Sequence, residues 1–369
     1  MDHMQLVLQR PAELEKQLES FMTEQQRKGS AEYHHWLTVQ EFGDLYGVAP
    51  ADIQTVTGWL GNHGFRVDSV LPSGMAIEFS GNAGQVRQAF HTEIHNLDVK
   101  GEAHFANMTD PRIPAALTGV VKGVRALHNF MPHPHNKKRT AFDTGYGFHD
   151  VAPADLATIY NLNPAFSNGI TGQGQTIAVV ELSLLANPGD VTTFRNTFGL
   201  SGYSGTFSQV VETGPVTCLN PGVNQSYGGA ETEAALDAEW AGASAPGTNI
   251  VLAACQSSGT VNGMEIAFQN LIDTPNPPQI ISVSFGECEA FEGAAGNASL
   301  VNMYQEAAAL GISVFVASGD SGAAGATLTR PTPTTELRSA GMLRLRITSP
   351  SAARISATPM PAGNRMACR

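Results

Sequence analysis

The sequence is poor in charged residues, in aromatic residues and in long apolar runs. Charged residues make up 15% of the 369 positions and aromatic residues 7%. No uncharged apolar run approaches the roughly 18 residues that a membrane-spanning helix needs, which argues against a membrane protein. The 38 glycines and 21 prolines, with 42% hydrophobic residues, indicate a loop-rich globular chain rather than a disordered one. The net charge of -12 disfavours nucleic acid and anionic membranes as partners.

Basic residues are almost absent from the middle of the chain. Residues 1–139 hold 13 Lys and Arg against 15 Asp and Glu, an ordinary balance. Residues 140–325 hold one base, Arg195, against 17 acids. Residues 326–369 reverse the sign, with seven Arg and one acid. The charge balance differs so much between the three stretches that we predict three separate parts of the protein.

The first third of the chain alternates between strand and helix patterns. A capping box at Thr38-Val-Gln-Glu41 and a proline at Pro50 mark two helix starts. Alternating patterns over about a hundred residues predict a small α+β domain of the split βαβ, ferredoxin-like kind. We expect strands at 5–9, 64–70 and 75–79 and helices at 11–28, after Thr38, at 51–63 and at 83–90.

A basic segment bounded by proline follows this first part. Met131-Pro-His-Pro-His135 runs into Asn136-Lys-Lys-Arg139. Such a composition predicts an extended linker that is open to proteolysis. We place the processing point near 133–142.

The middle of the chain has short runs rich in Ile and Val, separated by helical segments. Runs of this kind predict a parallel sheet covered by helices on both faces, with the chemistry at the carboxyl ends of its strands. The glycines around Gly172 precede the first strand and no Lys follows, which excludes a phosphate-binding loop. Strands are expected at 176–180, 249–253, 280–284 and 312–317, and helices at 263–271 and 299–310.

The helical segment 228–240 carries two carboxylates four residues apart. Glu233 and Asp237 therefore lie on one face of the predicted helix. One interpretation is a solvated acidic face. The other is a buried pair, because the segment is rich in alanine and contains no basic residue. Two crowded, partly buried carboxylates repel each other, which raises one pKa and allows that group to act as a general base or acid.

A further candidate, Asp320, follows the last clear strand in Ala317-Ser-Gly-Asp-Ser-Gly322. An Asp in such a turn is often only a helix N-cap. If it is buried and protonated, its hydroxyl can donate a hydrogen bond to an oxyanion.

The first part resembles the activation propeptide of the sedolisin (kumamolisin-type) serine-carboxyl peptidases over residues 5–134. The resemblance implies a folded prodomain that assists folding and blocks the active-site cleft until it is removed. It lies in an ordered series of short segments: Tyr33–Thr38, Pro50–Ile53, Gly64-Phe65, Ile77–Ser80, Ala89–Glu93, Ala106-Asn107 and Pro111–Pro114.

The middle part resembles the catalytic domain of the same family. The matching segments are Glu233 to Ala243, Ile281 to Glu289 and Ser318 to Gly322, in this order. The resemblance implies that Glu233 is the general base, Asp237 orients it and Asp320 completes the oxyanion hole. It further implies a subtilisin-like fold, protein or peptide substrates and a secreted endopeptidase that works at acidic pH through a serine acyl-enzyme. No signal peptide is visible at the start of this sequence.

Two features of the family pattern are not found. No Gly-Thr-Ser, the context of the nucleophile, occurs after Asp320, and neither does the Asp-containing calcium site expected near the C-terminus. The resemblance therefore implies that the family binds calcium. We expect no calcium site in this chain. We expect a truncated chain that is inactive as printed.

The arginine-rich tail has two interpretations. It is either a disordered basic tail or the product of a reading-frame shift near Gly325. Read one frame over with permitted codons, residues 342–356 give Ala-Ser-Thr-Pro-Tyr-Asn-Val-Ala-Val-Gly-Gly-Thr-Asp-Phe, which resembles the next segment of the family. We favour the shift, and resequencing the gene through Gly325 would show it. The expected divisions are a propeptide domain at 4–134, a linker at 135–150, a partial catalytic domain at 151–325 and an aberrant tail at 326–369.

The cysteines do not fix a disulfide pattern. Cys218, Cys255 and Cys288 lie in the middle part, and Cys368 lies in the tail. Cys218 with Cys255 is one pairing, and Cys288 with a cysteine of the alternative frame is another.

A function of a different class also stays open: a non-catalytic protein whose propeptide-like domain binds and inhibits a related peptidase.

Overall fold

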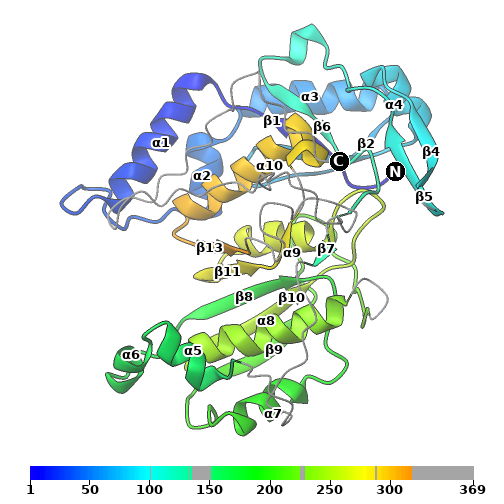
Figure 1. Cartoon of the computed structure of the whole chain (residues 1–369). Helices are drawn as coiled ribbons and strands as arrows, with labels where there is room; N and C mark the ends of the chain where they lie inside the picture. Colours follow the sequence, from blue (N-terminus) through cyan, green and yellow to red (C-terminus); the bar gives the residue numbers. More distant parts are fainter. Residues whose placement is uncertain (100, 132, 135–150, 225–228, 287–288, 318–369) are drawn as a thin grey trace, which may run out of the picture.

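The computed structural model describes residues 1–99, 101–131, 133–134, 151–224, 229–286 and 289–317. The first part is a four-stranded antiparallel sheet with strand order β2-β3-β1-β6 (Figure 1). Helices precede β2 and follow β3, which is the split βαβ arrangement that the sequence predicts. The strands are β1 (Met4–Leu8), β2 (Arg66–Val70), β3 (Ala76–Ser80) and β6 (Val121–Arg125). The helices are α1 (Ala12–Gln26), α2 (Val39–Tyr46), α3 (Pro50–Asn62) and α4 (Ala83–Phe90).

Local capping explains where two of these helices begin. The Thr38 hydroxyl accepts from the Glu41 amide at 3.2 Å, and the Glu41 carboxylate accepts from the Thr38 amide at 2.8 Å. This reciprocal pair is the predicted capping box. Asn82 and Gln85 form a second box at the start of α4. A hairpin of β4 (Ile94–Val99) and β5 (Glu102–Asn107) and a short 3₁₀ helix, η1 (Ala115–Leu117), complete this part.

The second part is a five-stranded parallel sheet with helices on both faces. Its strand order is β13-β11-β8-β10-β9. Along β8, Ile177 and Val179 pack with α8, whereas Ala178 and Val180 pack with α9. This alternation confirms the predicted fold class. The strands are β8 (Thr176–Glu181), β9 (Thr206–Val210), β10 (Asn249–Ala254), β11 (Ile280–Val283) and β13 (Ser313–Val316).

The helices of this part include one that bends sharply. In α10 (Glu289–Ala309), Gly293 has φ 66° and ψ -175°, a conformation that glycine adopts readily because it has no Cβ. The sequence pattern missed the edge strand β9, because Thr206–Val210 has no run of Ile and Val. The other helices are α5 (Pro153–Ile159), α6 (Asn163–Ser167), α7 (Gly189–Thr197), α8 (Ala230–Ser244) and α9 (Gly263–Ile272). Within the described residues, no helix is long and apolar enough to cross a membrane.

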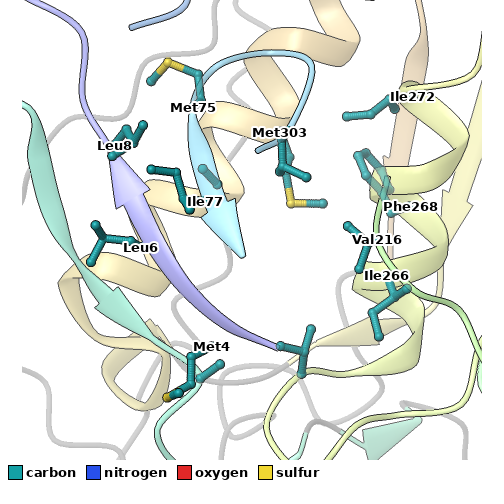
Figure 2. Close-up of a cluster of buried hydrophobic side chains, with 14 of the residues drawn as sticks. Met4, Leu6, Leu8, Met75, Ile77, Val216, Ile266, Phe268, Ile272 and Met303 are labelled. Atoms are coloured by element: carbon teal, nitrogen blue, oxygen red, sulfur yellow. The ribbon is translucent and has the colours of Figure 1, made fainter. Parts of the chain in front are cut away.

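The two parts share one continuous hydrophobic core. Figure 2 shows Leu6 and Ile77 of the first sheet in the same cluster as Phe268 of α9 and Met303 of α10. Backbone contacts join the parts as well, since the Leu37 amide donates to the Ala309 carbonyl at 3.1 Å. The first part is therefore packed against the second by buried apolar surface, in addition to being connected to it by the chain.

A two-residue strand after the first part pairs with the second. In β7 (His133–Pro134) and β12 (Phe285–Gly286), Pro134 lies opposite Phe285 and His133 opposite Gly286, in antiparallel register. The segment that leads out of the first part thus pairs with β12, which directly follows β11. The expected linker 135–150 and tail 326–369 lie outside the described residues.

Candidate active site

Helix α8 places the two predicted carboxylates against the parallel sheet. Gly229 precedes the helix at φ 101°, in the left-handed region. Ala234 and Ala238 pack on β8 and β10, which brings the same side of the helix toward the sheet. Glu233 is 4% exposed and Asp237 is half-buried. Of the two interpretations of the acidic helix, the buried pair is correct, since a solvated face would leave Glu233 exposed.

A third carboxyl, Glu181, joins them, and the sequence analysis missed it. It is the last residue of β8 and is fully buried. Burial raises the pKa of Glu181 well above its ordinary value, and the neighbouring carboxyls of Asp237 and Glu233 raise it further. The one signal in the sequence is a glutamate at the carboxyl end of the buried run Thr176–Glu181, where a parallel sheet collects its chemistry.

Two opposing effects act on the pKa of Asp237. Burial raises its pKa, while contacts with Glu181 and with Ser284, just after β11, lower it. Glu181 and Asp237 therefore interact directly, and Glu233 lies close enough for its charge to act on Glu181.

Other acidic groups near α8 do not belong to this cluster. Burial and the nearby Asp190 raise the pKa of Glu239 to about 7, but Glu239 is two residues from Asp237 and so on another side of the helix. The predicted Asp320 lies outside the described residues. Within the described ranges, no group of three or more His, Cys, Asp or Glu could hold a metal ion, and the calcium of the family stays an untested expectation.

A disulfide fixes the loop that leads to α8. Cys218 and Cys255 are bonded, with their Cα atoms 5.3 Å apart, so one of the two open pairings is present. The Gln256 amide donates to the Leu219 carbonyl at 2.8 Å beside it. The disulfide and this hydrogen bond hold the loop before α8 to the end of β10. Cys288 lies outside the described residues.

Comparisons with known proteins find similarity in both parts of the chain. A family model described as "Pro-kumamolisin, activation domain" matches residues 3–130. Kumamolisin of Bacillus sp. (strain MN-32) is 29% identical over 77% of this chain and 51% of its own length. Sedolisin of Pseudomonas sp. (strain 101) is 27% identical over 84% of this chain and 52% of its own length.

Residues 3–130 therefore match the Pro-kumamolisin activation domain, and the chain as a whole is similar to kumamolisin and sedolisin. Human tripeptidyl-peptidase 1 is another relative, 28% identical over 80% of this chain and 52% of its own length. A solved structure of Pseudomonas sedolisin, a serine-carboxyl proteinase complexed with pseudo-iodotyrostatin, aligns with a TM-score of 0.37 and 24% identity over 47% of this chain and 45% of that chain. The chain spans about half the length of the curated relatives it matches. The first part is hereafter the activation domain (residues 3–130), and the part with the parallel sheet, residues 151–317, is hereafter the body. The boundaries predicted at 134 and 151 stay predictions.

Proposed function

We propose that this chain is the proform of a secreted, acid-acting serine-type endopeptidase of the sedolisin family. The observation that carries the proposal is the convergence of Glu181, Glu233 and Asp237 at the carboxyl edge of the parallel sheet. Such an edge is the usual place for chemistry in this class of sheet. The whole enzyme's activity rests on the family relationship together with this cluster.

In this proposal Glu233 is the general base. It takes the proton of a serine hydroxyl as the serine oxygen attacks the peptide carbonyl, and it passes that proton to the leaving amine. Water then attacks the acyl-enzyme and gives a proton to Glu233, and Glu233 passes this proton to the departing serine oxygen, which releases the acid product and restores the serine hydroxyl. Asp237 orients Glu233, and Asp320 donates to the oxyanion. The serine is expected in a Gly-Thr-Ser context, which the printed sequence does not contain after Asp320.

The electrostatics of the cluster favour acid conditions. Burial, and then the neighbouring carboxyls of Asp237 and Glu233, raise the pKa of Glu181, which favours its protonated form. In this proposal the proton on Glu181 limits the negative charge in the cluster at acid pH.

The pairing of β7 with β12 supports an extended peptide as the ligand. Phe285 and Gly286 present their backbone to another strand directly after Ser284, which is in contact with Asp237. An open strand edge binds extended peptides of varied sequence through main-chain hydrogen bonds. We propose that the chain's own segment at 133–134 occupies the substrate position in the proform, and that processing follows nearby, within 133–142.

The alternative, inhibition in trans, is favoured by the shared core of the two parts. Residues 1–139, mixed with an active sedolisin-family enzyme at acid pH, are expected to slow its cleavage of a peptide substrate. The same fragment with Gln5→Arg, which puts a charge where β1 meets Ser299 of α10, is the matched control and is expected to inhibit much less. Equal cleavage rates with and without the unaltered fragment would reject an inhibitory role.

A further inference from the structure

One face of the activation-domain sheet packs on helix α10. Figure 1 shows β1 and β6 beside this helix, and both strands contact it. Gly123 and Arg125 of β6 lie on the same face of the sheet, because side chains alternate along a strand. Gln5 of β1 is paired with Arg125 and lies on this face too. Arg125 Nη2 lies 2.5 Å from Glu265 of α9 and 3.8 Å from Glu292 of α10, so this face is the one that meets the body.

Two further bonds fix the position of the sheet along α10. The Ser299 hydroxyl donates to Gln5 Oε1 at 3.5 Å. Asn302 Nδ2 donates to the Leu8 carbonyl at 3.4 Å. Ala295, Ser299 and Asn302 share one side of the helix, because they are spaced by four and three residues. Together with the ion pairs of β6, these bonds limit how far the sheet can slide or lift to make room for a larger side chain.

Between these contacts, the backbone of β6 comes close to Ala295 at Gly123. A Cβ added to Gly123 would lie 2.8 Å from the Ala295 Cβ and 3.7 Å from the Ala295 Cα. Non-bonded carbon atoms pack at about 3.5–4.0 Å, so the first distance is too short and the second is an ordinary contact. The Ala295 Cβ cannot rotate away, because it is fixed to the helix backbone. An added methyl therefore requires the strand or the helix to move.

The fold of the activation domain gives no reason of its own for a glycine at this position. Apart from Ala295 and the chain neighbours of Gly123, no described residue would have an atom within 4 Å of the added Cβ. Gly123 is also not among the glycines with positive φ. Glycine inside a strand lowers stability, because it loses more conformational freedom on folding than other residues. The reason for the glycine therefore lies in the contact with α10.

We propose that Gly123 and Ala295 decide which bodies the activation domain can dock on. The space between β6 and α10 holds one methyl group at this point, and Ala295 supplies it. The partner that fits is therefore a body whose helix has alanine or glycine at this position, in the same chain or in a related peptidase. A bulkier residue on either side separates the two surfaces. This inference concerns the fit of the two parts and does not depend on the proposed catalytic activity.

Hydrogen exchange of the full chain at one fixed pH tests the proposal. The reporter is the amide of Leu37, a buried residue; this amide donates to the Ala309 carbonyl across the contact and exchanges when the activation domain lifts off. In Gly123→Ala, the protection of this amide is expected to fall by about 10- to 100-fold, the usual effect of overpacking. Unchanged protection would overturn the proposal.

A second background separates docking from a role of Gly123 inside its own domain. Ala295→Gly removes the clashing Cβ and leaves the 3.7 Å contact, so in this background Gly123→Ala is expected to lower protection by less than about threefold. Comparison within one background also removes the cost of placing glycine in a helix. An equal loss in both backgrounds would contradict the proposal, since the strand itself would then require glycine. Should Gly123→Ala fail to fold, recovery of folded protein in the double variant supports the proposal, and no recovery overturns it.

Two single variants complete the test. Gly119→Ala adds the same methyl just before β6, where no described atom lies within 4 Å, and is expected to leave the Leu37 protection within a few-fold. A loss equal to that of Gly123→Ala would rule out the steric explanation. Ala295→Leu enlarges the other side of the contact and is expected to lower the protection at least about tenfold. Full protection in this variant would refute the restriction to small residues.

Discussion

Replacing Glu233 by Gln is expected to lower kcat by roughly 10⁴-fold or more in a chain that continues in frame to a Gly-Thr-Ser segment. The amide keeps the size of the side chain but cannot accept the serine proton. Because Glu233 is 4% exposed against β8 and β10, the isosteric change leaves its packing unaltered. The measurement is the initial rate of peptide cleavage at acid pH, with circular dichroism as the check on folding.

Glu239→Gln is the matched control for this experiment. It removes a carboxyl from the same helix, α8, on a side that does not meet Glu181. Its kcat is expected to stay within a few-fold of the unaltered enzyme. Undiminished cleavage by the Glu233 variant would remove Glu233 from the mechanism, and an equal loss in both variants would indicate a general effect of changing the helix.

Arg125→Ala is expected to destabilise the closed proform by about 3–5 kcal/mol, the usual cost of leaving buried carboxyls without their cation. Glu265 and Glu292 would then be enclosed between the activation domain and the body with no positive partner from β6. The measurement is the urea midpoint of the full chain, or the Leu37 exchange rate at a fixed pH.

Two further variants test whether the loss of stability in Arg125→Ala comes from the lost charge. Arg27→Ala breaks an exposed Arg–Glu pair in the same domain and is expected to change the midpoint little. The double variant Arg125→Met with Glu265→Gln removes both charges and is expected to recover a large part of the stability. A double variant no more stable than Arg125→Ala would mean that the arginine acts through its packing and not through its charge.

The sequence alone predicted the features that depend on residues close together in the chain. Period-two alternation predicted β1 and β3, short runs of Ile and Val predicted β8, β10 and β11, and the Thr38–Glu41 capping box was predicted at the residues that form it. The spacing of Glu233 and Asp237 placed them on one side of α8 for the same reason, since four residues make about one helical turn.

Groups that meet across long stretches of chain could not be predicted in this way. Glu181 is 56 residues before Asp237, and only the packing of α8 on β8 brings the two side chains together. The buried carboxyls of Asp273, after α9, and Glu306, on α10, likewise meet only because these two helices lie side by side. No pattern in the sequence marks either acid, because burial depends on what packs above a residue.

The sequence by itself indicated most of the strands and helices, the split βαβ arrangement of the first part, the resemblance to the sedolisin family and the acidic helix, because these depend on local patterns of residues. The tertiary structure alone decided that the acidic helix is buried, that Glu181 completes its cluster, that Cys218 pairs with Cys255 and that both parts share one core. The physical reason is that desolvation and contact depend on distances through space, which the order of residues along the chain does not specify.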